Sequence, residues 1–180
     1  MRTSELDILI IPGLGDSGPD HWQTRWQAKL PTARRVAQDD WTAPSRAQWE
    51  QRIVEAAETA TRPAVLVAHS LGAWAAVHAA PRIAPWVKGA FLVAPPSAQS
   101  PEIGGVDRAF FAEVARLPFP AVLVASQDDP YGPIEHAQAL AAALGAEFAD
   151  AGVAGHINAD SGHGPWPEGL MRFAGFLRKL

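Results

Sequence analysis

The stretch Val65-Leu-Val-Ala-His-Ser70-Leu-Gly-Ala-Trp-Ala75 decides the fold of this chain. An apolar run typical of a strand passes through a short polar turn into an alanine-rich segment, and alanine has the highest helix propensity. Such a sharp turn accepts only small flanking residues, because its backbone lies close to neighbouring chain. Gly72 meets this requirement fully, and Ala68 meets it with one additional methyl group. The stretch therefore predicts a buried strand, a tight turn that exposes Ser70, and a helix.

Further apolar runs of strand length occur along the chain, and they are nearly continuous, as in strands buried on both faces. The expected strands are Asp7–Ile11, Ala64–Ala68, Gly89–Ala94, Pro120–Ala125 and, less regular and nearer the sheet edge, Ala146–Asp150. The expected helices are Asp20–Leu30, Arg46–Thr59, Leu71–Ala80, Asp107–Ala115, Ile134–Leu144 and Glu168–Leu180. This alternation predicts an α/β fold, a three-layer α/β/α sandwich with a mostly parallel sheet. Ligands bind at the carboxyl ends of the strands in such sheets.

Composition narrows the class of protein. The 180 residues fit one domain over residues 1–180, with 48% hydrophobic and 19% charged residues and a net charge of −4. Scattered Lys and Arg argue against a nucleic-acid partner. The absence of cysteine excludes disulfides, thiolate metal sites and thiol nucleophiles. Without a signal peptide core or a membrane-length apolar stretch, a soluble, cytoplasmic protein is expected. Pro95–Gly105 is either a short lid or a surface loop.

Ser70 is a candidate nucleophile, and a serine needs a base and an orienting carboxylate from elsewhere in the chain. The loop after Pro120–Ala125 carries Asp128 and Asp129. We expect Asp129 to orient the base, because Pro130 keeps its backbone extended. In the alternative, the two carboxylates are only turn and helix-cap residues.

The base is expected in the loop after the last strand. That loop contains Gly155-His156-Ile-Asn158, and His156 lies nearest the strand end. His163 is its main competitor, and spacing alone does not decide between them. His136 falls within a helical segment, where a solvated side chain is expected.

The first strand ends in the glycine-rich turn Ile10-Ile-Pro-Gly13-Leu14-Gly15-Asp16-Ser17. We expect the N–H groups of Leu14 and Leu71 to stabilise an oxyanion. The expected substrate-binding residues are Gly13, His21, Trp22 and Trp166, with one of the tryptophans lining an apolar pocket. The alternative is a dinucleotide loop, since Gly13-x-Gly15-x-x-Gly18 matches its fingerprint. Against this alternative, Pro19 and Asp20 at the start of the next helix are unfavourable for binding a pyrophosphate.

Four motifs in order carry a family resemblance. They are Ile11-Pro-Gly13-Leu-Gly-Asp-Ser17 with His21-Trp22-Gln23, Ala68-His-Ser70-Leu-Gly72, Asp128-Asp129-Pro-Tyr131, and Gly155-His156-Ile-Asn158 with Ser161-Gly-His-Gly-Pro-Trp166. Over nearly its whole length the chain resembles the small serine hydrolase family of the α/β-hydrolase fold, which contains the retinoblastoma-binding serine hydrolase and the bacterial YdeN-type proteins.

The resemblance implies a Ser70–Asp129–His156 triad on a compact sheet without a large cap, and esterase-like or peptidase-like hydrolysis of a small-molecule substrate. No cofactor or metal is expected. Binding of retinoblastoma protein through a Leu-x-Cys-x-Glu peptide is not supported, since the chain lacks cysteine. Two other functions remain open: a binding module that has lost turnover, and a metal-dependent hydrolase that uses His156, His163 and the Asp128-Asp129 pair.

Overall fold

Six strands form one sheet in which each neighbouring pair is parallel. The computed structural model describes residues 1–180, and the strand order is β2-β1-β3-β4-β5-β6. The strands are β1 (Asp7–Ile11), β2 (Ala33–Arg35), β3 (Ala64–His69), β4 (Val87–Val93), β5 (Ala121–Ala125) and β6 (Glu147–Asp150). The predicted α/β class and parallel sheet are confirmed, and the least regular predicted strand lies at the edge as β6.

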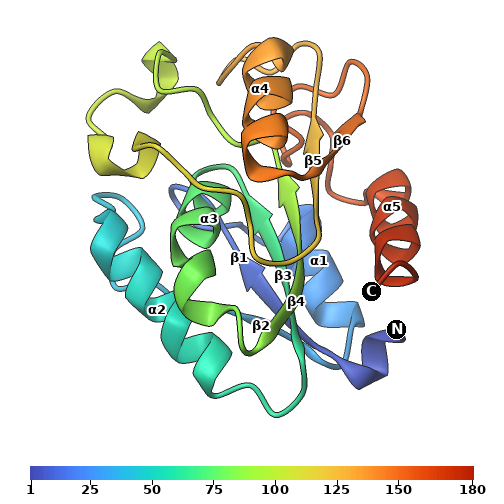
Figure 1. Cartoon of the computed structure of the whole chain (residues 1–180). Coiled ribbons are helices and arrows are strands. Elements are labelled where there is room, and N and C mark those ends of the chain that lie inside the picture. Colours follow the sequence, from blue (N-terminus) through green and yellow to red (C-terminus); the bar gives the residue numbers. More distant parts are fainter.

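Five α-helices cover the two faces of the sheet (Figure 1). They are α1 (Trp22–Lys29), α2 (Arg46–Glu58), α3 (Leu71–Ile83), α4 (Ile134–Leu144) and α5 (Pro167–Leu177). Helices α2, α3 and α4 contribute to one buried cluster of 34 residues, and α1 and α5 to another of 18. Successive residues of β1 alternate between them, so that Leu9 faces the first cluster and Ile8 the second. This three-layer sandwich buries both faces of the sheet, which explains the continuous apolar runs.

Two sequence predictions were wrong. Strand β2 was not predicted, because its three residues, Ala33-Arg-Arg35, include two charged side chains and sit half-buried at the sheet edge beside β1. The helix predicted over Asp107–Ala115 is only a 3₁₀ turn at Arg108–Phe111. Its neighbouring phenylalanines pack on different partners, Phe110 against Trp49 and Phe111 against Trp74.

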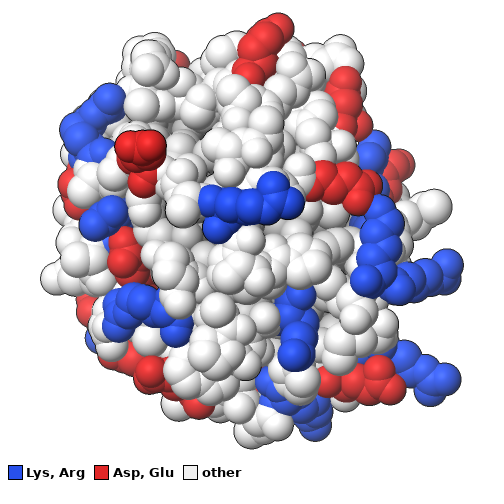
Figure 2. All heavy atoms as spheres, in the orientation of Figure 1, with Lys and Arg blue, Asp and Glu red and all other residues white.

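Charges of both signs are mixed on one face of the molecule (Figure 2). On the face shown in Figure 2, basic and acidic side chains are interspersed and form no continuous basic stripe. None of the helices has the combined length and apolarity required to span a bilayer.

The chain reverses direction across the sheet at β1. From β1 it crosses to β2 on one side, and β3 and the later strands lie on the other side. The loops after β1 and β3 therefore leave the sheet side by side at their carboxyl ends, which is where open α/β sheets bind ligands. Residues Gly13 and Ser70 lie on these two loops.

Gly72 allows the two loops to meet. A Cβ atom at this position would lie 2.2 Å from the carbonyl oxygen of Pro12 and 2.6 Å from that of Ile11, both too close for any real contact. The first turn of α3 thus rests directly on the backbone at the end of β1. The absence of a side chain at residue 72, expected from the sequence, is a steric requirement of this packing.

We predict that Gly72→Ala lowers the free energy of unfolding by at least about 2 kcal/mol, because the new methyl group overlaps backbone atoms that cannot move aside. Urea unfolding measures the effect. The matched control is Gly175→Ala on the exposed side of α5, where an added Cβ meets nothing within 4 Å. It should leave stability unchanged or raise it by about 0.5–1 kcal/mol. Equal losses in the two variants would contradict the steric account.

Candidate active site

Ser70 occupies a strained turn between β3 and α3. Its φ of 55° and ψ of −128° lie outside the regions that non-glycine residues normally adopt. The turn is held by a hydrogen bond from the Ser70 N–H to the Val93 carbonyl, 2.9 Å long. Gly13 lies against it, since a Cβ there would be 2.7 Å from the Ser70 Cβ. The backbone thereby lifts the Ser70 hydroxyl to the carboxyl edge of the sheet.

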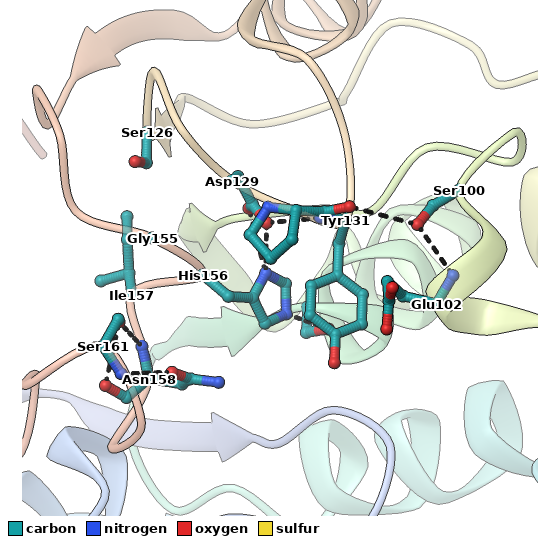
Figure 3. Close-up of polar contacts among 12 residues, drawn as sticks. Ser100, Glu102, Ser126, Asp129, Tyr131, Gly155, His156, Ile157, Asn158 and Ser161 are labelled. Atoms are coloured by element: carbon teal, nitrogen blue, oxygen red, sulfur yellow. Dashed lines mark hydrogen bonds and ion pairs between the residues drawn. The ribbon is translucent and has the colours of Figure 1, made fainter.

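A histidine and a carboxylate from two later loops reach this hydroxyl. His156 Nε2 lies 2.9 Å from Ser70 Oγ, and His156 Nδ1 lies 2.9 and 3.0 Å from the two oxygens of Asp129. Figure 3 shows Asp129 beside one ring nitrogen of His156, and the opposite ring nitrogen is the one that contacts Ser70. The side chains of His156 and Asp129 are 7% and 6% exposed, so this contact is shielded from water. The structure thus brings together Ser70, Asp129 and His156.

Asp128 does not take part in this contact. Its carboxylate accepts hydrogen bonds from Ser126 Oγ and from the backbone N–H groups of Ala154 and Gly155, at 2.7–2.9 Å. These bonds, first that from Ser126, lower the pKa of Asp128 below its usual value. Ala154 and Gly155 immediately precede His156. Asp128 therefore secures the loop that carries the histidine, a role that its place in the sequence did not reveal.

Tyr131 completes the wall around the histidine. Its ring stacks on the His156 imidazole with centroids 4.0 Å apart and planes 29° from parallel. Tyr131 lies within one of the four sequence motifs, but no role was expected for it from the sequence. The available signals were its position two residues after Asp129 and its status as the only tyrosine of the chain.

Two further histidines lie beside His156 and are held neutral. His21 and His69 have ring centroids 4.8 Å apart, and His69 lies 4.9 Å from His156. Burial, then the neighbouring charge of His156, lowers the pKa of His21 to about 4. The same causes place the pKa of His69 well below its usual range.

Hydrogen bonds fix the tautomers of both rings. His21 Nδ1 accepts the Gln23 N–H at 3.1 Å, so a neutral His21 carries its proton on Nε2. His69 Nε2 lies 2.9 Å from the His156 carbonyl oxygen, to which it must donate. His69 therefore anchors the backbone of His156, and His21 presents a donor.

A cavity of about 290 Å³ opens over Ser70. Its lining mixes polar and apolar groups: Gly13, Leu14, Asp16, Gly18, His21, His69, Ser70, Leu71, Ile103, Tyr131, His156, Asn158, Ala159 and Asp160. The N–H groups of Leu14 and Leu71 have no hydrogen-bond partner within the protein, since Leu71 begins α3. Both residues line the cavity over Ser70, and their N–H groups are free of partners in the protein.

Neither Trp22 nor Trp166, one of which was expected to line the substrate pocket, lines the cavity over Ser70. Trp22 is fully buried and donates its indole N–H to the Ile157 carbonyl at 2.9 Å, and Trp166 packs against it with ring centroids 5.0 Å apart. Both belong to the core between the sheet and helices α1 and α5, outside the cavity. Of the four expected substrate-binding residues, only Gly13 and His21 line the cavity.

Other histidines of the chain lie outside the cavity. His163 is 3.1 Å from Ser161 Oγ through its Nδ1, and His136 is half-buried on α4 rather than solvated as expected. No group of three or more His, Asp or Glu side chains is arranged to hold a metal ion. Within Pro95–Gly105, Ile103 is buried and forms part of the cavity wall.

Comparison with known proteins agrees with this architecture. The model of the serine hydrolase family matches residues 8–175. A protein from Pectobacterium atrosepticum described as a YdeN-like hydrolase is 35% identical, with 97% of this chain and 91% of that chain covered and a TM-score of 0.84. The ydeN product of Bacillus subtilis has the same TM-score at 20% identity, with 97% and 99% covered. The carboxylesterase CesB of B. subtilis shares the fold at 15% identity, with a TM-score of 0.64 and 94% and 82% covered. No match is found among curated proteins.

We predict that His21 makes stability depend on pH. Its pKa is about 4 in the folded chain and about 6.5 when unfolded, so between these values only the unfolded chain takes up the proton. Stability is therefore lost as the pH falls from 6.5 toward 4. Between pH 7 and 4.5 the wild type should lose about 2 kcal/mol more than His21→Asn, measured by urea unfolding. An equal loss in both proteins would show that His21 is not held neutral.

Proposed function

The chain belongs to the serine hydrolase family, and from this we propose that it hydrolyses carboxylic esters through an acyl-enzyme intermediate on Ser70. The observation that carries the proposal is the unbroken chain of short contacts from Asp129 through His156 to the Ser70 hydroxyl. The fold shared with the carboxylesterase CesB supports ester chemistry. The two free N–H groups in the cavity give further support.

In the first step, His156 Nε2 takes the proton of Ser70 Oγ as this oxygen attacks the ester carbonyl. The carbonyl π electrons move onto oxygen, and the N–H groups of Leu14 and Leu71 stabilise the resulting oxyanion. The carbon–oxygen bond to the leaving alcohol then breaks, and His156 returns the proton to that alcohol. An acyl group remains on Ser70.

In the second step, water attacks the acyl carbon while His156 accepts a proton from it. The second tetrahedral intermediate collapses, Ser70 recovers its proton from the imidazolium, and the carboxylic acid leaves. Asp129 accepts a hydrogen bond from His156 Nδ1–H, which keeps Nε2 free as the base. His69 contributes by holding the His156 carbonyl, and thus the backbone from which the base projects.

We predict that Ser70→Ala abolishes turnover. A fluorophosphonate probe should label the folded wild type on Ser70, and the variant should lose at least about 10³-fold in kcat on p-nitrophenyl acetate, since Ser70 Oγ is the hydroxyl that contacts the base His156 Nε2. Absorbance of released p-nitrophenolate and peptide mapping of the label provide the measurements. Equal rates in both proteins, with no label on Ser70, would instead indicate a binding module without turnover.

We predict that the two adjacent carboxylates respond differently to amide substitution. Asp129→Asn should lower kcat by roughly 10³- to 10⁴-fold, because an amide at this position favours the wrong imidazole tautomer. Asp128→Asn should lower the melting temperature more and kcat much less, because Asp128 secures the loop and makes no contact with His156. Rate assays measure kcat and thermal unfolding measures the melting temperature of both variants. A larger loss of kcat in Asp128→Asn would overturn the assignment.

A further inference from the structure

The cavity over Ser70 contains three side-chain donors without a partner in the protein. They are His21 Nε2, the Asn158 amide nitrogen and the Tyr131 hydroxyl, all on residues that line the cavity. None forms a hydrogen bond to another residue, and none is among the fully buried unpaired atoms, so each remains accessible. Figure 3 shows the Tyr131 hydroxyl and the Asn158 amide projecting away from Asp129, on the open side of His156.

Each donor is fixed in place by the rest of its residue. His21 is 6% exposed and its Nδ1 is occupied by the Gln23 N–H, which leaves only Nε2 for a ligand. The Asn158 side-chain oxygen accepts the Ser161 N–H at 3.0 Å, so its NH₂ group is the free end. The Tyr131 ring is stacked on His156, which restricts the position of its hydroxyl. The donors are therefore preorganised.

His21 also departs from the usual helix start. It occupies the N-cap position of α1, where its Nδ1 accepts the Gln23 N–H. Asn, Asp and Ser are the preferred residues at this position, and they satisfy the same N–H. Capping alone therefore does not require an imidazole. What the imidazole adds is a second nitrogen that reaches the cavity.

A hydrocarbon acyl chain would be a poor occupant of this cavity. It would displace water from donors that it cannot bond, and each buried unpaired donor carries a desolvation penalty. Oxygen atoms in the substrate avoid this penalty. An anionic substrate is also disfavoured, because the only charged side chains of the lining, apart from the titratable histidines, are those of Asp16 and Asp160. Asp16 is paired with Arg35 at 2.7 Å, whereas Asp160 has no ion-pair partner.

Resting on the proposed ester hydrolysis, we infer that the natural substrate is a small, uncharged ester with oxygen atoms close to the scissile carbonyl, as in a hydroxy- or alkoxy-acyl ester. His21 Nε2–H and the Tyr131 hydroxyl donate hydrogen bonds to these oxygens. The cavity volume of about 290 Å³ suits a short acyl group. The specificity of the site is thus set by polar contacts rather than by an apolar pocket.

The test uses two esters of nearly equal shape, p-nitrophenyl methoxyacetate and p-nitrophenyl butyrate. Rates of hydroxide-catalysed hydrolysis correct for their different intrinsic reactivity. After this correction the wild type should prefer the methoxyacetate by at least about 10-fold in kcat/KM. No preference, or a preference for butyrate, would overturn the inference.

Two variants assign the preference to its residues. His21→Asn keeps the N-cap oxygen but loses the donor at Nε2, and Tyr131→Phe loses only a hydroxyl while the ring can still stack on His156. Each should reduce the corrected preference by about threefold or more with an unchanged melting temperature. His21→Gln, whose longer amide can place a donor near the former Nε2, should restore part of the preference. If both deletions leave the preference intact, His21 and Tyr131 are not the donors.

These experiments distinguish failure of the substrate inference from failure of the proposed ester hydrolysis. If neither ester is hydrolysed and Ser70 resists the fluorophosphonate, the ester hydrolase proposal fails. If both esters are hydrolysed through Ser70 but without the corrected preference, only the substrate inference fails.

Discussion

The close approach of the β3–α3 turn to the end of β1 is the constraint on which the site depends. Ser70 has a positive φ. The two loops lie so close together at Gly13 and Gly72 that neither position has room for a side chain. The strain of this turn is offset by the packing of the sheet and of α3 around it. The same contact brings Leu14, Ser70 and Leu71 into the lining of one cavity, so a single steric arrangement holds the strained serine and forms the cavity beside it.

Electrostatics then differentiate groups that look equivalent in the sequence. Of two adjacent carboxylates, Asp129 contacts the imidazole, while Asp128 accepts backbone N–H groups of the loop before it. Of three clustered histidines, His21 and His69 have their pKa values lowered by burial and then by the neighbouring charge of His156. Only His156 has both a carboxylate on one nitrogen and a serine on the other. The surroundings of each group, rather than its residue type, determine its role.

The sequence was sufficient for the parallel sheet, the turn at Ser70 and the order of the three residues that meet there, because each leaves a local pattern: a continuous apolar run, small flanking residues, or a polar loop after a strand. Strand β2 left no such pattern, since Ala33-Arg-Arg35 lies half-buried at an edge. Contacts between distant loops could not be predicted from the sequence either. The stacking of Tyr131 on His156 and the burial of Trp22 and Trp166 depend on which side of the sheet each loop crosses, and local spacing does not encode that.

The central claim is that Ser70 forms a covalent acyl intermediate. The most direct measurement is the mass of wild-type protein quenched in acid during its first turnovers on p-nitrophenyl acetate, followed by mapping of the modified peptide. The account predicts one acetyl group per chain, carried by Ser70, together with a burst of p-nitrophenolate. Hydrolysis with no acetyl group on the protein, or with the acetyl group on another residue, would contradict it.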